Sequence, residues 1–189
     1  MRYFPKLKGK KVYLSPINPD DFPLYTKWMN DLAVTVGLGN AAKTISLAVE
    51  RGFLEKMIRE DNHFAIVRVE DDKLLGNASL MFVDNIHRNA ELGLFIGEEE
   101  NRGKGYGREA IELLLVHGFR VLNLHNILLR VYSFNEKALS IYEKIGFSVV
   151  GRRRNSYFFN GKYYDIVYMD ILAEEFESPL LDTVLTEIT

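Results

Sequence analysis

The sequence contains no cysteine in 189 residues. This absence excludes disulfides, thiolate nucleophiles and cysteine-ligated metal sites, and it fits a reducing, cytoplasmic setting. Histidine is also scarce, and the four histidines are scattered without metal-ligand spacing. We therefore expect no metal site.

Neither sign of charge is in large excess. Lys and Arg number 24 against 26 Asp and Glu, a formal net charge of −2, which argues against a nucleic-acid partner. No apolar run is long enough to span a bilayer, and Met1–Lys6 lacks the apolar core of a signal peptide. We therefore expect a cytoplasmic protein without a membrane partner.

Apolar periodicity predicts an α/β (α+β) fold on a mixed central sheet, with the order β-α-α-β-β-β-α-β-α-β-β. Asn18 with Pro19 predicts a helix start, because Asn caps helices and Pro fits the first helical position. Asn160–Gly161 predicts a type I′ hairpin. The expected strands are 11–14, 63–69, 74–83, 90–97, 126–132, 147–157 and 162–172. The expected helices are 18–32, 46–59, 106–122 and 135–145, with a loop at 37–40.

Two segments divide the chain. Residues 1–172 form one expected domain, long enough to bury a substantial core. Residues 173–189 form an acidic tail whose apolar residues recur at helical spacing, namely Leu180, Leu181, Val184, Leu185 and Ile188. We expect this tail to pack on its own domain; the alternative is an intersubunit contact in a homodimer.

A glycine-rich turn is the first candidate site. Arg102-Gly103-Lys104-Gly105-Tyr106-Gly107 follows an apolar run ending at Ile96-Gly97 and precedes a long helical pattern. Such a turn brings backbone N–H groups together at the positive end of a helix, which suits phosphate. The alternative is a tight turn whose glycines serve only the backbone.

A second motif follows about thirty residues later. The pattern Arg/Gln-x-x-Gly-x-Gly is met by Arg102, Gly105 and Gly107, and Asn-x-x-Ala-x-x-x-Tyr-Glu-Lys-x-Gly-Phe is met from Asn135 to Phe147. Together, and with a strand between them, they resemble the GNAT superfamily of acyl-CoA-dependent N-acetyltransferases. The resemblance covers about residues 8–172. The run 160–165 with Met169 is similar to the branch of ribosomal-protein N-terminal and spermidine acetyltransferases.

This resemblance implies acetyl-CoA as the acyl donor. The backbone of the turn would hold the pyrophosphate, and the edge of a splayed central strand would hydrogen-bond the pantetheine arm like an additional strand. A backbone N–H near Phe95 would stabilise the oxyanion. Asn135 would contact the cofactor, or act only as a helix cap. The implied cofactor-binding residues are Leu94, Phe95, Ile96, Arg102, Gly103, Lys104, Gly105, Tyr106, Gly107 and Asn135.

Two side chains are candidates for catalysis. Tyr142 occupies the position of the family's tyrosine and is the expected general acid; alternatively it is a core aromatic residue of an amphipathic helix. Glu91 alternates with apolar neighbours on its strand and is the expected base, or an exposed strand carboxylate. His87 is a weaker candidate for the base and fits a turn residue better.

The expected acceptor site is lined by Trp28, Tyr132 and Ser133, although Trp28 and Tyr132 also fit core packing. The basic cluster Arg152–Arg154 is expected to face solvent; the alternative is that it attracts an acidic substrate or the adenosine 3′-phosphate. The acidic cluster Glu98–Glu100 is also expected to face solvent. The sequence thus predicts direct acetyl transfer, without a covalent enzyme intermediate, to a primary amine: a protein N-terminus, a polyamine or another small amine. The alternative is a non-catalytic acyl-CoA-binding or sensing module. A dinucleotide-binding fold is disfavoured, because no second βαβ repeat follows.

Overall fold

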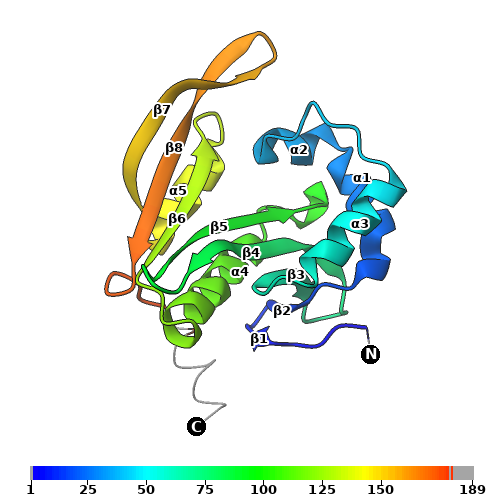
Figure 1. The fold of residues 1–189 in the computed structure, drawn as a ribbon, viewed down its shortest axis with the longest axis horizontal. Coiled ribbons are helices and arrows are strands. Elements are labelled where there is room, and N and C mark those ends of the chain that lie inside the picture. Colours follow the sequence, from blue (N-terminus) through cyan, green and yellow to red (C-terminus); the bar gives the residue numbers. More distant parts are fainter. Residues whose placement is uncertain (1, 179, 181–189) are drawn as a thin grey trace.

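One eight-stranded sheet runs through the computed structural model, which describes residues 2–178 and 180 (Figure 1). The strand order is β1-β2-β3-β4-β5-β6-β8-β7, and every neighbouring pair is antiparallel except β5 with β6. This is the mixed sheet predicted from the sequence. The strands are β1 Leu7–Lys8, β2 Val12–Pro16, β3 His63–Arg68, β4 Leu74–Asp84, β5 Asn89–Ile96, β6 Asn126–Tyr132, β7 Ser148–Phe159 and β8 Lys162–Leu172.

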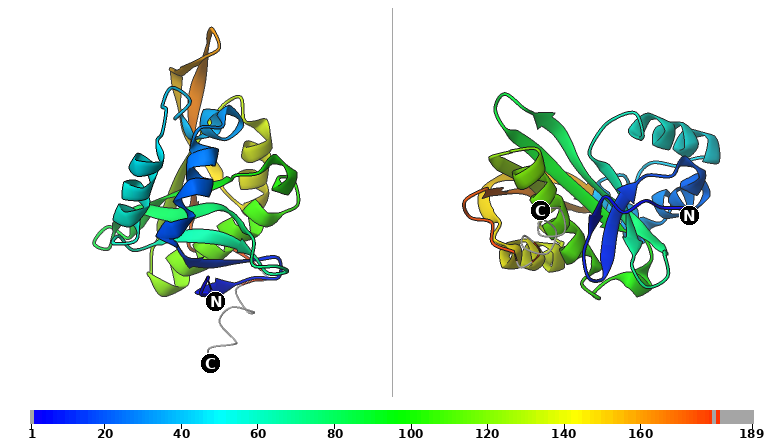
Figure 2. Two further views of the ribbon diagram at one scale, coloured as in Figure 1. Left: turned by 90° about the vertical axis from the view of Figure 1, so that its right-hand side faces the viewer. Right: turned by 90° about the horizontal axis from the view of Figure 1, so that it is seen from below.

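Helices cover both faces of this sheet (Figures 1 and 2). Alternate residues of each strand point to opposite faces, so the sheet contributes to two cores. The larger core packs the sheet against α4 and α5, and the smaller one packs it against α1, α2 and α3. The helices are α1 Phe22–Met29, α2 Leu32–Leu38, α3 Leu47–Met57, α4 Tyr106–Val116 and α5 Glu136–Ile145, with short turns η1 Pro19–Asp21, η2 Glu99–Asn101 and η3 His117–Val121.

The two central strands separate, as predicted. β5 and β6 pair only from Asn89–Leu92 with Asn126–Leu129. Beyond Leu92 the two strands diverge, and Figure 1 shows β5 turning away from β6. The rest of β5 keeps its pairing with β4 on the other side. An unpaired strand edge is thus exposed inside the sheet.

The predicted helix at 18–32 is divided into three pieces. Asn18 caps only the short turn η1, by accepting from Asp20 N–H, and α1 ends at Met29. Asp31 then caps a new helix by accepting a hydrogen bond from Ala33 N–H at 2.8 Å. The predicted loop at 37–40 was wrong at its start, because α2 continues to Leu38 before Gly39 ends it in the left-handed conformation.

Other boundaries also differ from the prediction. The short strand β1 was not expected, and the helix predicted for 106–122 is α-helical only to Val116, after which η3 is a π-helical turn. In the tail, Phe176 and Leu180 are buried in the larger core, and Phe176 packs on Phe119 with ring centroids 5.6 Å apart. Leu181, Val184, Leu185 and Ile188 lie outside the described residues. Within the described part of the chain, no helix has the length and hydropathy needed to cross a bilayer.

Candidate active site

The glycine turn has the geometry of an anion site. Gly103 and Gly105 have positive φ angles of 75° and 88°, and Gly105 is the N-cap of α4 without any side-chain cap. Within the described residues, no backbone N–H from Gly103 to Arg108 has a hydrogen-bond acceptor. These N–H groups lie at the positive end of the helix dipole. The turn therefore fits a phosphate group, whose oxygens would accept several of these bonds.

Arg102 has a different role from the one expected from its charge. Its guanidinium donates to the backbone carbonyls of Ile96 at 3.1 Å, Gly97 at 2.9 Å and Ala33 at 3.1 Å. Arg102 therefore ties the end of β5 to α2 and to the start of the turn. Its guanidinium is therefore engaged at the end of β5, and the free groups of the turn are its backbone N–H groups. Lys104, in contrast, is exposed.

The open edge of β5 presents the backbone of Leu94 and Ile96. Gly97 N–H donates to Leu75 C=O, so the polar groups of Gly97, Phe95 and every second residue before them point to β4. The intervening residues point to the gap. Ile96 C=O already accepts from Arg102. The N–H and C=O of Leu94 and the N–H of Ile96 are therefore the groups available to an extended ligand.

Tyr142 reaches the larger core from α5. It is half-buried, packs its ring edge-on to Phe147 at 5.8 Å, and contacts the apolar residues under β5 and β6. Burial raises the pKa of Tyr142 to about 12. The phenol therefore keeps its proton at neutral pH, as a general acid requires.

Asn135 starts the same helix. Its side-chain oxygen accepts from Ala138 N–H at 3.2 Å, which is the expected cap. This bond uses only the oxygen of the amide, and the NH₂ group is left for another partner. Both predicted roles of Asn135 are therefore compatible with the structure.

Glu91 lies on the opposite face of the sheet from Tyr142. Strand alternation places it with Gly93 and Phe95, on the face covered by α1, α2 and α3. Its carboxylate accepts from Arg130 Nε at 2.6 Å, and its side chain is 16% exposed against 48% for Arg130. The two candidate catalytic residues thus lie on the two sides of the separated strands. His87 is a turn residue, 73% exposed and bonded to Asp84 at 2.8 Å.

The three residues predicted to line the acceptor site have different surroundings. Trp28 is 1% exposed, with Tyr25 and Phe95 edge-on to its ring at 5.3 and 5.8 Å, an environment that fits core packing. Tyr132 is half-buried, and its ring packs against Phe134 and Tyr157 at the end of β6. Ser133 Oγ accepts from the N–H of Asp165 in β8 at 3.1 Å.

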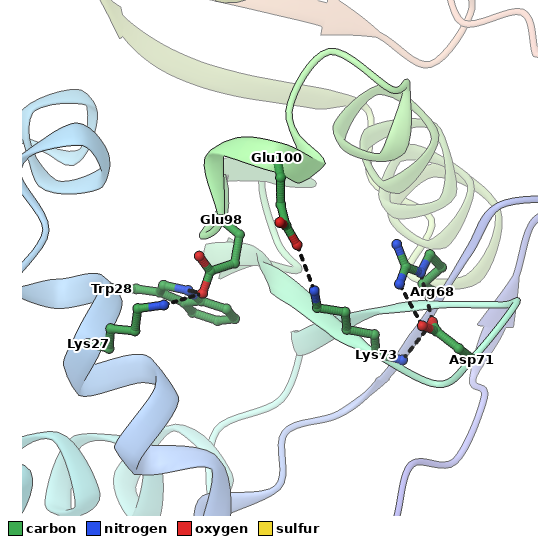
Figure 3. A network of polar contacts seen from close by, with 7 residues as sticks. All are labelled: Lys27, Trp28, Arg68, Asp71, Lys73, Glu98 and Glu100. Atoms are coloured by element: carbon green, nitrogen blue, oxygen red, sulfur yellow. Dashed lines mark hydrogen bonds and ion pairs between the residues drawn. The ribbon is translucent and has the colours of Figure 1, made fainter.

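Two acids of the cluster beside the turn, Glu98 and Glu100, are bonded to side chains of other elements (Figure 3). Glu98 accepts from Lys27 Nζ at 2.8 Å and Trp28 Nε1 at 3.2 Å, and Glu100 pairs with Lys73 at 2.9 Å. Glu98 is only partly exposed, so the expectation that all three acids face solvent was wrong for it. The carboxylates of Glu98 and Glu100 are thus held by lysines rather than by the backbone N–H groups of the turn.

A line of polar contacts on the same face as Glu91 was not predicted. Ser79, which pairs with Gly93 across the strands, donates to Asn77 Oδ1 at 3.1 Å. His63 Nδ1 lies 2.8 Å from Ser79 Oγ, and His63 Nε2 lies 3.4 Å from Glu60. These contacts depend on strand register, and no local sequence pattern marks them.

A parted central sheet beside an uncapped glycine turn defines a class of protein that binds an extended, phosphate-bearing ligand between its strands. The comparisons name the family: the model of the acetyltransferase (GNAT) domain matches residues 11–148. The chain belongs to the GNAT acetyltransferase family.

Named relatives agree with this membership. The chain is 35% identical over 122 residues to spermidine N(1)-acetyltransferase of Escherichia coli, an alignment that covers 65% of each chain. It is 35% identical over 107 residues to the protein named "putative ribosomal N-acetyltransferase YdaF" of Bacillus subtilis, with 57% of this chain and 58% of YdaF covered. The alignments thus span less than two thirds of these curated relatives.

A solved structure matches over a longer span. Spermidine N-acetyltransferase from Vibrio cholerae, in complex with CoA and spermine, superposes with a TM-score of 0.79 and 28% identity. The match covers 87% of this chain and 96% of that one. The fold predicted from the sequence is therefore confirmed.

Proposed function

We propose that this protein transfers an acetyl group from acetyl-CoA to the primary amine of a polyamine or similar small amine. The observation that carries the proposal is the pairing of two unsatisfied backbone surfaces: the free N–H groups of Gly103–Arg108 and the open edge of β5 at Leu94–Ile96. The first suits a pyrophosphate, and the second suits an amide-bearing arm. The relatives named above support the choice of donor and acceptor.

Acetyl-CoA supplies a thioester whose C–S bond breaks as the amine nitrogen bonds to the carbonyl carbon. Glu91 takes the proton that the amine loses, directly or through a water molecule. The N–H of Leu94 or Ile96 donates to the carbonyl oxygen as negative charge develops on it. Tyr142 gives its phenolic proton to the departing sulfur, so that CoA leaves as a thiol. No residue needs to carry the acetyl group.

The acceptor side offers both a carboxylate and aromatic faces. Glu91 attracts a cationic amine, and the rings of Tyr132, Phe134 and Tyr157 cluster within 6 Å of one another near the end of β6. A protein N-terminus is the second candidate acceptor, because YdaF is as similar to this chain in identity as the spermidine enzyme is.

The experiment that tests the function is an acceptor screen that follows the release of free CoA. The purified protein is mixed with acetyl-CoA and, separately, with spermidine, spermine, monoamines and N-terminal peptides. We expect turnover with polyamines that exceeds turnover with peptides at least tenfold. Turnover with peptides alone would move the assignment to the second candidate, and binding of CoA without any turnover would favour the sensing module.

Glu91→Gln should lower kcat/KM for the acceptor at least tenfold at pH 7, because the amide accepts no proton and has no charge to attract an ammonium group. Glu60→Gln is the matched control, since it makes the same change at the outer end of the His63 contact line. We expect kcat/KM for the acceptor to fall only in Glu91→Gln. An unchanged kcat/KM in Glu91→Gln, or an equal loss in Glu60→Gln, would remove Glu91 from the role of base.

A further inference from the structure

One row of side chains crosses the sheet beside the point where β5 and β6 separate. Glu91 of β5 is in register with Leu128 of β6, and Leu128 is in register with Asp170 of β8. Side chains in direct register on neighbouring strands point to the same face of a sheet. Glu91, Leu128 and Asp170 therefore form one row, which we call the carboxylate row, on the face that carries the proposed base.

The outer part of the carboxylate row lies on a face of β8 that the helices leave partly exposed. Val167, Met169 and Ile171 are 0% exposed and belong to the larger core. Asp170 alternates with them, so its side chain points to the opposite face, where it is partly exposed. Leu128, in the middle of the row, is partly exposed as well. A ligand bound at Glu91 can therefore extend over Leu128 to Asp170.

The two acids of the row differ in their partners. Within the described residues, Asp170 forms no ion pair, and its carboxylate accepts one hydrogen bond, from Asn126 Nδ2 to Oδ2 at 2.7 Å. Glu91 accepts from Arg130 Nε through Oε1 at 2.6 Å. Asp170 thus has a second oxygen and a negative charge available to a cationic ligand.

The spacing of the row matches a linear polyamine. Neighbouring strands lie about 4.8 Å apart, so the backbone positions of Glu91 and Asp170, two strands apart, are separated by about 10 Å. An extended chain advances about 3.3–3.6 Å for every three bonds, so the nine bonds between the terminal nitrogens of spermidine span about 10–11 Å. Leu128 between the two acids is placed to contact methylene groups. The order acid, apolar, acid therefore matches the order ammonium, methylene, ammonium.

We propose that Asp170 binds the far ammonium group of a linear polyamine whose reacting amine lies at Glu91. This inference rests on the proposed function, because it requires an acceptor amine at Glu91. A hydrogen bond between an ammonium group and a carboxylate is stronger than one between neutral groups. The far ammonium takes no part in the transfer, so its contact with Asp170 lowers KM and leaves kcat unchanged. Asp170 is thus a specificity-determining residue that favours polyamines over monoamines.

The test compares two acceptors that differ only in the far ammonium group. Diaminooctane has terminal nitrogens nine bonds apart, as in spermidine, and octylamine has one nitrogen on the same chain. Release of free CoA should give wild type a kcat/KM at least fivefold higher for diaminooctane than for octylamine. Asp170→Asn should raise KM for diaminooctane and spermidine at least fivefold, and should change their kcat and the kcat/KM for octylamine less than twofold. The new amide oxygen still accepts from Asn126, which preserves the fold.

Asp20→Asn is the matched control, because it removes the same charge from an exposed carboxylate of η1, and it should leave the preference for diaminooctane unchanged. Asp170→Glu restores the charge and should retain the preference. An equal loss for both amines in Asp170→Asn, a preference that survives this substitution, or a wild type without preference would overturn the inference while leaving the proposed function standing. A wild type that binds CoA but acetylates none of the three amines would refute the proposed function together with the inference.

Discussion

Tyr142→Phe is expected to lower kcat at least tenfold while changing the affinity for CoA less than twofold. The substitution removes only the hydroxyl, so the ring still packs on Phe147 and the helix keeps its place. What is lost is the proton for the departing sulfur, a contribution of general acids that is typically about 100-fold or more. Steady-state kinetics together with equilibrium titration of CoA measure the two quantities separately.

The pH profile gives the control for this prediction. Because burial raises the pKa of Tyr142 to about 12, the protonated phenol is the active form and persists well into the alkaline range. Loss of its proton should therefore not lower wild-type kcat below about pH 10. An unchanged kcat in Tyr142→Phe would remove the hydroxyl from the mechanism. If wild-type kcat fell with a midpoint near pH 8, and this fall were absent in Tyr142→Phe, the raised pKa of Tyr142 would be contradicted.

Trp28→Ala should lower the free energy of unfolding by about 3–5 kcal/mol, the usual cost of truncating a buried aromatic residue. Trp28 is 1% exposed, its ring fills the space above Gly97, and it joins α1 to the end of β5 through Phe95. A loss of this size is a large part of the stability of a typical domain. Urea unfolding followed by circular dichroism measures it.

Trp28→Phe is the matched variant, because it keeps an aromatic ring but loses the N–H that donates to Glu98. We expect it to lose much less stability than Trp28→Ala. The acceptor KM of Trp28→Phe separates the two interpretations of this residue. Wild-type stability in Trp28→Ala combined with a raised acceptor KM in both variants would make Trp28 a wall of the acceptor site.

The elements of the fold that the sequence predicts are those with local signals. The hairpin at Asn160–Gly161 and the cap at Asn135 are confirmed, because both depend on residues that are adjacent in the chain. The division of the first predicted helix was missed, although Asp31 is a good helix cap, because the apolar spacing of α1 continues past it to Leu32. Strand β1 was missed because two residues carry no periodicity.

In the candidate site, too, features made by consecutive residues could be predicted from the sequence, and contacts between distant residues could not. The turn from Gly103 to Gly107 was recognised because an anion site of backbone N–H groups is encoded by consecutive residues. The role of Arg102 could not be predicted, since one of its acceptors is Ala33, 69 positions away in the chain. The ion pair of Glu91 with Arg130 likewise depends on two strands that meet only in the folded sheet.

The parting of β5 and β6 has a mechanical consequence. Only four residue pairs, Asn89–Leu92 with Asn126–Leu129, join the five strands on one side to the three on the other. The larger core continues beneath these pairs, so packing against α4 and α5 also holds the two halves of the sheet together. An extended ligand that hydrogen-bonded to the backbone of Leu94 would occupy the gap between β5 and β6 and would add contacts where the two strands no longer pair. Ligand binding in this gap would then stabilise the folded sheet, because a ligand that binds only the folded state raises the free energy of unfolding.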